Sequence, residues 1–238
     1  MSEQPAPQGN WNTGASQPVF NAPRSVLAVI GVLAAMHGGL YLAGEHWQII
    51  ALELLSIIPS RFTNPARIVV EGSQYWSLVT YMLLHGDWMH LLFNSLWLLV
   101  FGTPVARYLG SLRFCALSLA AGILGGLSSL ALHWGEDIFV IGASGAVSGL
   151  LAAAIPIMYG RRVPGGARPL SFGELVTSSR ALMFTAIWLG LTLVSGASGW
   201  TGNSFAADSG IAWEAHIGGF IGGLAAFYAL APRHVRPA

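Results

Sequence analysis

A serine stands among small residues in the segment Gly142-Ala143-Ser144-Gly145, immediately before an apolar run that ends near Met158. Small neighbours leave the Ser144 hydroxyl uncrowded. The amides at the start of a helix can also stabilise an anion, so this serine could act as a nucleophile. The same residues also fit a helix N-cap followed by small residues for close membrane-helix packing. The motif alone favours the packing interpretation, and the rest of the chain must decide.

Three more polar side chains occur inside apolar segments, at the same end of their predicted helices as the serine. His90 and Asn94 are four residues apart and therefore share one helix face. His216 lies just over a turn into the last apolar segment. A neutral His216 imidazole could take the Ser144 proton as a general base. His90, Asn94 and the Ser144 amide could donate to a developing oxyanion. No carboxylate is expected at this depth, so we expect a Ser/His dyad without an Asp.

Glycines would let the two helices that carry the serine and the histidine approach closely. Gly145 and Gly149 share one helix face, and Gly219 and Gly223 share the face of His216. Such small-xxx-small faces bring two backbones together in membranes, which would put the serine and the histidine within hydrogen-bond reach. The residues that we expect to support this packing are Gly142, Gly145, Gly219 and Gly223.

The composition defines the environment of these residues. Hydrophobic residues make up 54% of the 238-residue chain and charged residues only 9%, with a mean hydropathy of +0.60. A soluble domain carries about 25% charged residues, so this is a multi-span membrane protein. The net charge of +1 gives no sign of a nucleic-acid partner. The single Cys115 cannot form an intramolecular disulfide.

The apolar pattern predicts an all-α membrane protein with six spans, the first of which has about the 20 residues that cross the hydrocarbon layer. They are residues 25–44, 87–105, 114–132, 144–159, 181–195 and 211–231. Residues 45–74 predict an interfacial loop with short amphipathic helices, and 161–180 a basic loop. We assign 24–232 to one membrane domain. Residues 1–23 are a disordered tail, residues 233–238 a second tail, and the loop 196–210 with the fifth span a candidate gate.

The charges indicate an orientation. All eleven basic residues are arginines, and in the six-span arrangement only Arg61 and Arg67 fall on the side that carries the acidic residues. The positive-inside rule then places both termini in the cytoplasm. The site at Ser144 would consequently open toward the outer, periplasmic side of the membrane.

The fourth span is unusually short. It holds about 16 apolar residues, or about 24 Å of helix, against a hydrocarbon core of about 30 Å. Because Arg161 and Arg162 fix its cytoplasmic end, Ser144 should lie below the outer surface. Unpaired helix amides at that depth are tolerable where water reaches them, so we predict a water-filled cavity at Ser144.

With these residues in place, the chain resembles the rhomboid intramembrane serine proteases over about residues 75–231. The resemblance rests on three motifs in the same order and six-span setting, with two smaller matches. They are Gly142-Ala143-Ser144-Gly145, His90-Leu91-Leu92-Phe93-Asn94 and Ala215-His216-Ile217-Gly218-Gly219 with Gly223, together with His85 and Tyr75-Trp76.

The resemblance implies a six-helix bundle of rhomboid type with a lipid-embedded first loop, in a bacterial inner membrane. It implies Ser144 as nucleophile, His216 as base, and His90 and Asn94 in the oxyanion hole. The implied substrates are single-span membrane proteins, cut in or near the transmembrane segment. No metal or other cofactor is implied.

The chain departs from the family pattern at three positions. The first-loop motif often reads Trp-Arg, and here it is Trp76-Ser77. The end of the second span often carries a glutamate where this chain has Ala106, and one turn after the serine an aromatic residue is often found in place of Ser148. These positions concern loop anchoring, helix-end bonding and the rigidity of the histidine, and none of them removes a reacting group.

Other functions fit less well. A metal site that joins His85 and His90 with His133 or His216 is disfavoured, because no His-Glu-x-x-His and no carboxylate occurs among them. The other histidines read as a packed residue in the first span or as interfacial and exposed residues; they are His37, His46, His133 and His234. A rhomboid-fold pseudoprotease that binds transmembrane segments without cleaving them stays open. A small transporter would show intrabundle acids or inverted repeats, and neither is found.

Overall fold

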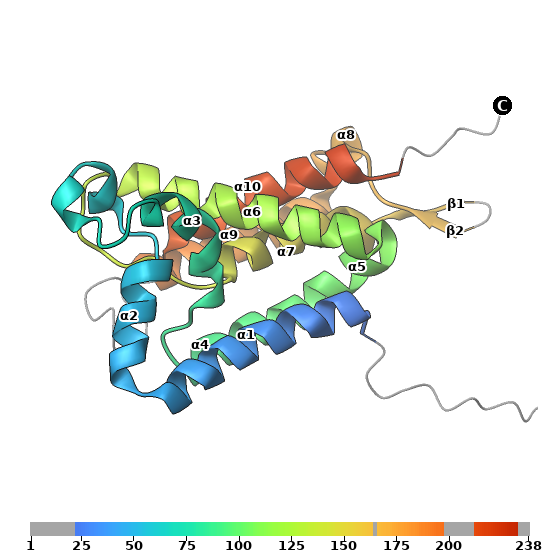
Figure 1. The fold of residues 1–238 in the computed structure, drawn as a ribbon. Coiled ribbons are helices and arrows are strands. Elements are labelled where there is room, and N and C mark those ends of the chain that lie inside the picture. The colour runs from blue at the N-terminus through green and yellow to red at the C-terminus, as the bar shows by residue number, and fades with distance from the viewer. Residues whose placement is uncertain (1–21, 164–165, 198–211, 233–238) are drawn as a thin grey trace, which may run out of the picture.

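The computed structural model describes residues 22–163, 166–197 and 212–232. Within these ranges six long helical segments run side by side (Figure 1). They are α1 (Arg24–Ala43), the continuous rod of α4 (Trp88–Trp97), η4 (Leu98–Gly102) and α5 (Thr103–Leu109), α6 (Ser111–Leu132), α7 (Ser144–Met158), α9 (Ser179–Ala197) and α10 (Trp213–Leu230). The prediction of an all-α bundle is therefore confirmed.

The helices identify an integral membrane protein. Among the described residues, α1, the α4–α5 rod and α6 are long and apolar enough to cross a membrane by length and composition, and α7 and α9 are shorter apolar helices. The predicted disordered tail (apart from residues 22 and 23), the C-terminal tail and most of the predicted gating loop lie outside the described residues.

The second and third spans meet in a tighter turn than the sequence predicts. The α4–α5 rod continues to Leu109, and α6 already begins at Ser111. Gly110 alone makes the turn, with φ at 80°, a left-handed conformation that glycine adopts without strain. Arg107 and Arg113, which the predicted spans 87–105 and 114–132 leave in a basic turn between them, lie within the helices.

The segment after α7 is not the basic loop that the sequence predicts. The strands β1 (Arg161–Val163) and β2 (Gly166–Arg168) form an antiparallel hairpin, and the short helix α8 (Phe172–Leu175) follows. Ser171 and Glu174 cap α8 reciprocally, a capping box that a Ser-x-x-Glu pattern predicts. Arg168 donates to Glu174 at 2.6 Å and 2.8 Å, which holds the pKa of that carboxyl well below its usual value.

The first loop consists of short helices, as predicted. They are α2 (Glu45–Leu55), η1 (Pro59–Phe62), η2 (Pro65–Arg67), α3 (Ser73–Thr80) and η3 (Tyr81–Leu83). Trp47 and Ile49 on α2 are exposed, as suits a segment in contact with lipid. Trp76 Nε1 donates to the Leu54 carbonyl at 2.8 Å, so the tryptophan of the Trp76-Ser77 pair does anchor this loop.

A buried arginine provides the second anchor of the first loop. Arg61 is 2% exposed; its guanidinium donates to the Arg67 carbonyl at 3.3 Å and pairs with the Glu53 carboxylate at 3.0 Å. Burial lowers the pKa of Arg61, and the Glu53 carboxylate opposes that effect. An internal charge is tolerated where it is paired and hydrogen-bonded in this way.

The first loop is also fastened to the segment that leads into α7. Asp137 accepts hydrogen bonds from Arg67 Nε and Ser60 Oγ, each at 2.8 Å. These two donors, Arg67 first, lower the pKa of the Asp137 carboxyl. Ile57 and Val140 exchange backbone hydrogen bonds as an isolated bridge. The segment that leads into α7 is therefore hydrogen-bonded to the first loop.

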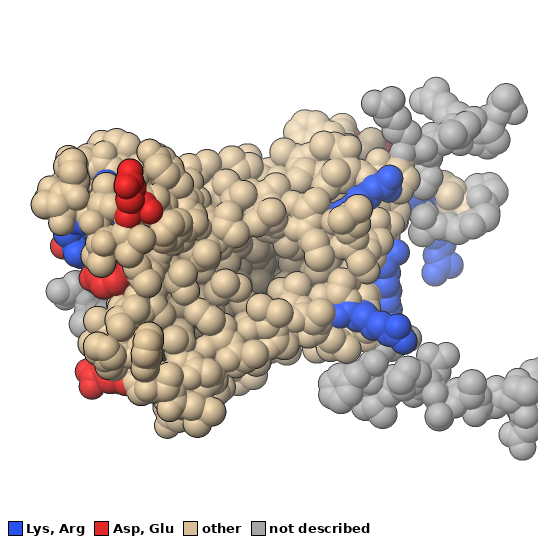
Figure 2. Space-filling model, in the orientation of Figure 1, with Lys and Arg blue, Asp and Glu red and all other residues tan. Residues whose placement is uncertain are grey.

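Charges gather at the two ends of the bundle (Figure 2). The end that carries α2 and the first loop shows the acidic side chains with a few basic ones, whereas the end near α5 and the hairpin shows arginines. The long middle is almost free of charge on the face shown. This distribution matches the segregation predicted from the sequence.

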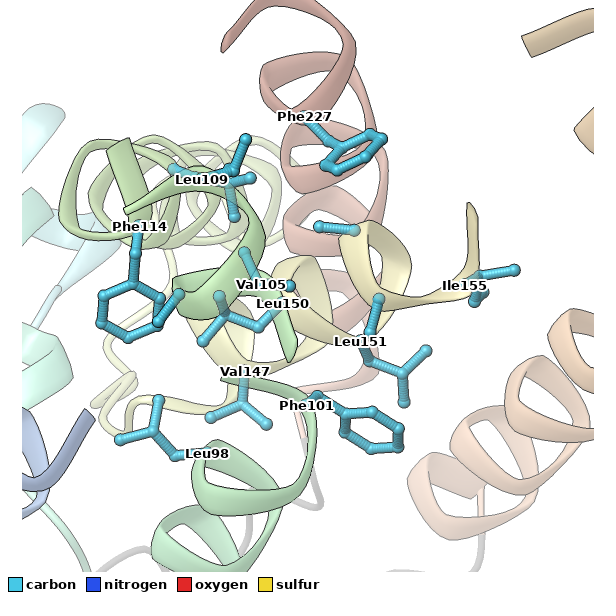
Figure 3. Packing of buried hydrophobic residues seen from close by; sticks show 14 of the residues in the cluster. Leu98, Phe101, Val105, Leu109, Phe114, Val147, Leu150, Leu151, Ile155 and Phe227 are labelled. Atoms are coloured by element: carbon cyan, nitrogen blue, oxygen red, sulfur yellow. The ribbon is translucent and has the colours of Figure 1, made fainter. Parts of the chain in front are cut away.

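Helix α7 forms the centre of the molecule. Every residue from Gly145 to Pro156 is buried. Val147 and Leu150 belong to the same core cluster as Phe101 on η4 and Phe227 on α10 (Figure 3). A helix that is apolar on all sides belongs in the interior, and its 15 residues confirm the short fourth span.

Glycines permit the closest helix contact in this core. A Cβ atom on Gly149 would lie 2.8 Å from the Gly219 carbonyl oxygen and 3.1 Å from Gly223 Cα. A Cβ atom on Gly223 would lie 2.5 Å from the Gly149 carbonyl carbon. The backbones of α7 and α10 therefore touch, as the glycine spacing predicts.

We expect Gly223→Ala to destabilise the fold by about 1–3 kcal/mol, because the added methyl group overpacks a backbone contact. The matched control is Gly190→Ala in α9, since a Cβ atom there meets nothing within 4 Å. Thermal unfolding in detergent should show a lower Tm for Gly223→Ala and a nearly unchanged Tm for the control. Equal melting temperatures would contradict the close α7–α10 contact.

Candidate functional site

Ser144 is the first residue of α7, and its side chain is half-buried. The turn before it is fixed by Gly142, whose φ is 115° and whose amide donates to the Tyr81 carbonyl at 3.0 Å. Tyr81 is buried, and its hydroxyl donates to the Gly122 carbonyl at 2.7 Å. The serine therefore stands on a turn that is attached to both the first loop and α6.

The start of α7 leaves amide groups available. The first four amides of a helix have no partner within the helix. Within the part of the chain that the structure describes, no side chain caps α7. The first amides of α7, that of Ser144 among them, are consequently available at the helix start, where the helix dipole favours negative charge.

His90 lies beside this turn, on the first turn of α4. Its amide donates to Asp87 Oδ1 at 2.7 Å, which caps the helix. The Gly86 amide donates to His90 Nδ1 at 3.4 Å, so the proton of the neutral ring is on Nε2. A Cβ atom on Gly142 would lie 2.8 Å from His90 Nε2 and 3.8 Å from Ser144 Oγ. The imidazole and the hydroxyl thus meet at the same glycine.

Asn94 follows His90 by one turn on the same helix. It is 4% exposed, and its Nδ2 donates to the His90 carbonyl at 3.1 Å. A side-chain amide has two hydrogens, so this bond uses one of them and orients the other.

His216 is half-buried near the start of α10. The neighbouring Ala215 carbonyl oxygen lies 3.3 Å from where a Cβ atom would stand on Gly145. A Cβ atom on Gly219 would lie 2.9 Å from Gly145 Cα. The two helices therefore touch one residue after Ser144 and one residue before His216. Among the described hydrogen bonds none joins these two side chains.

The structure therefore brings most of the predicted site together. Ser148 is buried in α7 one turn after the serine, and Ala106 is buried in α5. The four glycines that were predicted to support the packing all lie in close contacts, because a Cβ atom added to any of them would come near a neighbouring atom. They are Gly142, Gly145, Gly219 and Gly223.

The predicted water-filled cavity at Ser144 stays a prediction. One described cavity, of about 340 Å³, lies on α4 and is lined mainly by apolar side chains such as Trp88 and Leu92. Another, of about 370 Å³, lies at the opposite end of α7, beside Tyr159 and Arg180. No group of three or more His, Cys, Asp or Glu within 22–163, 166–197 and 212–232 is arranged to hold a metal ion.

Sequence reasoning missed a buried acid near the site. Glu214 was assigned to the charges of the outer side, and His133 was assigned to the interface or solvent. Glu214 is in fact 4% exposed, and its Oε1 accepts from Ser129 Oγ at 2.8 Å. His133 lies 3.3 Å from Glu214 and 2.8 Å from Glu136. An acid in a first helix turn usually serves the helix dipole, so the sequence alone gives no sign of this burial.

Comparison with known proteins gives one family. The family model described as "Rhomboid domain" matches residues 72–233. The match covers α3 to α10 and includes all of the candidate site residues.

Individual relatives agree with this family. The chain is 32% identical to Rhomboid protease GluP of Bacillus subtilis over 68% of its length and 27% of that protein. It is 33% identical to RHOMBOID-like protein 4 of Arabidopsis thaliana over 65% of its length and 34% of that protein. It is 30% identical to Rhomboid protease GlpG of Pectobacterium atrosepticum over 65% of its length and 49% of that protein. The chain thus spans half or less of the length of these relatives.

Gly142→Ala should disturb this arrangement, because the methyl group would press on the His90 ring and φ would be strained. The matched control is Gly110→Ala, which has a similar strain at φ 80° but meets nothing within 4 Å. We expect the reactivity of Ser144 toward a serine-directed phosphonate to fall by about tenfold or more in Gly142→Ala. It should change little in the control. Equal losses in the two variants would mean that strain, and not the position of His90, is responsible.

Proposed function

This chain belongs to the rhomboid family, and from that premise we propose that it is an intramembrane serine endopeptidase. Its substrates are single-span membrane proteins, which it cleaves in or near the transmembrane segment. The relatives named as rhomboid proteases support protease activity for the family. The residues assigned below extend that activity to this chain.

The observation that carries the proposal is the meeting of three helix ends around one serine. The His90 ring and Ser144 Oγ both lie within 4 Å of the position that a Cβ atom would take on Gly142, and the backbone contact at Gly145 brings α10 alongside. Acyl transfer requires a nucleophile, a base and oxyanion donors, and the starts of α4, α7 and α10 carry a hydroxyl, two imidazoles, a side-chain amide and helix amides that can supply them.

In the first step Ser144 Oγ attacks the carbonyl carbon of the scissile peptide bond. His216 accepts the hydroxyl proton as general base, which gives a tetrahedral intermediate with an oxyanion. His216 then returns this proton to the leaving amine, and the C–N bond breaks. A water molecule, activated by the same imidazole, hydrolyses the remaining ester and frees the serine.

The oxyanion is stabilised by donors that are already oriented. The Gly86 amide occupies His90 Nδ1, so His90 Nε2–H is free to point toward Gly142 and the serine. Asn94 offers the amide hydrogen that its bond to the His90 carbonyl leaves over. The Ser144 amide at the helix start is the third donor. Donors fixed in advance stabilise developing charge most effectively.

The site would open toward the outer, periplasmic side of a bacterial inner membrane. The arginine-rich end of the bundle would then face the cytoplasm together with both termini. The acidic end carries the first loop, so the loop that supports the α7 start would lie at the outer surface.

Ser144 should react covalently with a fluorophosphonate probe in detergent or liposomes, because its hydroxyl is activated by His216. We expect labelling to disappear in Ser144→Ala and to fall sharply in His216→Ala. The control is Ser118→Ala, which removes a hydroxyl bonded within α6 at 2.8 Å. Undiminished labelling of Ser144→Ala would rule out Ser144 as the nucleophile.

Asn94→Ala should lower turnover of a model transmembrane substrate by about a hundredfold, because one oxyanion donor is lost. Circular dichroism should show that the variant stays folded. Unchanged turnover would mean that Asn94 contributes only to packing and does not stabilise the oxyanion. A pseudoprotease would instead bind the substrate and cleave nothing, in the wild type and the variant alike.

A further inference from the structure

A buried carboxylate lies on the first turn of α10. Glu214 is 4% exposed, Ser129 Oγ of α6 donates to its Oε1 at 2.8 Å, and His133 Nε2 lies 3.3 Å from the same oxygen. His133 Nδ1 in turn lies 2.8 Å from Glu136 Oε2. These contacts join the first turn of α10 to the end of α6 and to the loop that leads to α7.

The residue that follows Glu214 on α10, Ala215, is fixed by close packing of its carbonyl group. The Ala215 carbonyl oxygen lies 2.6 Å from where a Cβ atom would stand on Gly125 of α6. It lies 3.3 Å from the corresponding position on Gly145 of α7. The carbonyl thus occupies a space that exists because both neighbours are glycines. His216 follows immediately, so its position depends on how this turn is seated.

Other contacts of α10 with α6 place Gly218 against Ser128 and Gly222 against Leu124. Small residues at these positions allow the two helices to approach closely. A hydrogen bond depends on both distance and angle, so the bond from Ser129 Oγ to Glu214 adds a directional constraint on the height and rotation of the first turn.

Burial of the Glu214 carboxylate at this position costs free energy of folding. Burial of a charge is unfavourable unless partners compensate for it, and an apolar side chain of similar size often stabilises a fold at least as well. Glu214 therefore points to a requirement for geometry rather than for stability.

We propose that Glu214 is a positioning residue for the reaction. Through its hydrogen bond from Ser129 and its ion-pair contact with His133 it fixes the position of the first turn of α10 and so directs His216 toward Ser144. This inference rests on the proposed function, because it assumes that His216 is the general base. Glu214 itself does not touch the substrate.

The test compares Glu214→Ala with Glu214→Gln in the full chain, reconstituted in liposomes with a single-span model substrate. For Glu214→Ala we expect kcat to fall by about tenfold or more while KM stays within about twofold, because chemistry and not binding is affected. Glu214→Gln should recover most of the activity, since a side-chain amide oxygen still accepts from Ser129. The control Glu71→Ala removes an exposed acid of the first loop and should behave as the wild type.

Two further variants keep the test decisive if Glu214→Ala does not fold. Ser129→Ala removes a single bond to Glu214, and Gly125→Ala pushes on the Ala215 carbonyl without touching Glu214. Both should lower kcat at nearly constant KM. An unchanged kcat in the folded Glu214→Ala and Ser129→Ala variants would overturn the proposal. So would a Glu214→Gln variant as inactive as Glu214→Ala, since charge and not hydrogen bonding would then be required.

Labelling and cleavage by the wild-type protein distinguish a failure of the positioning role of Glu214 from a failure of the proposed protease function. Absence of Ser144 labelling and of cleavage in the wild type would defeat the protease assignment itself. An active wild type together with equally active Glu214 variants would defeat only the positioning role.

Discussion

The backbones of α7 and α10 touch, and the arrangement of the candidate site depends on that contact. A Cβ atom on Gly219 or Gly149 would collide with the facing backbone, so both helices need glycine at these positions. Small residues are the means by which membrane helices pack without a hydrophobic driving force between them. The contact lies next to Ser144 on one helix and next to His216 on the other. The same glycines thus define both the core and the separation of the helix turns that carry Ser144 and His216.

The outer end of the bundle is built to hold the start of α7 in place. Gly142 is bonded to Tyr81, and Asp137 is bonded to Ser60 and Arg67 of the first loop. Arg61, buried against Glu53, completes the anchorage. A serine on a free helix end would lose its alignment with every motion of the loop. The first loop therefore serves as a support for the site.

Much of this architecture could be predicted from the sequence, and the exceptions share a physical cause. Hydropathy located the helices, and the short apolar run ending at Met158 placed Ser144 at a helix start. The spacing of Gly145 and Gly149 predicted the contact with α10. The buried Glu214 and the β1–β2 hairpin could not be found in this way. A hydrogen-bond partner across helices depends on their relative rotation, which periodicity does not contain, and a short strand pair in an arginine-rich segment has no hydrophobic alternation.

The central claim is that Ser144, His216, His90 and Asn94 act on one reacting carbonyl. An experimental structure of the protein inactivated by a phosphonate tests it most directly. We expect phosphorus bonded to Ser144 Oγ, with His216 at hydrogen-bond distance from the adduct, about 3 Å. The phosphonyl oxygen should lie at a similar distance, about 3 Å, from the His90 ring, the Asn94 amide or the Ser144 amide. An adduct on another residue, or a phosphonyl oxygen turned away from these donors, would contradict it.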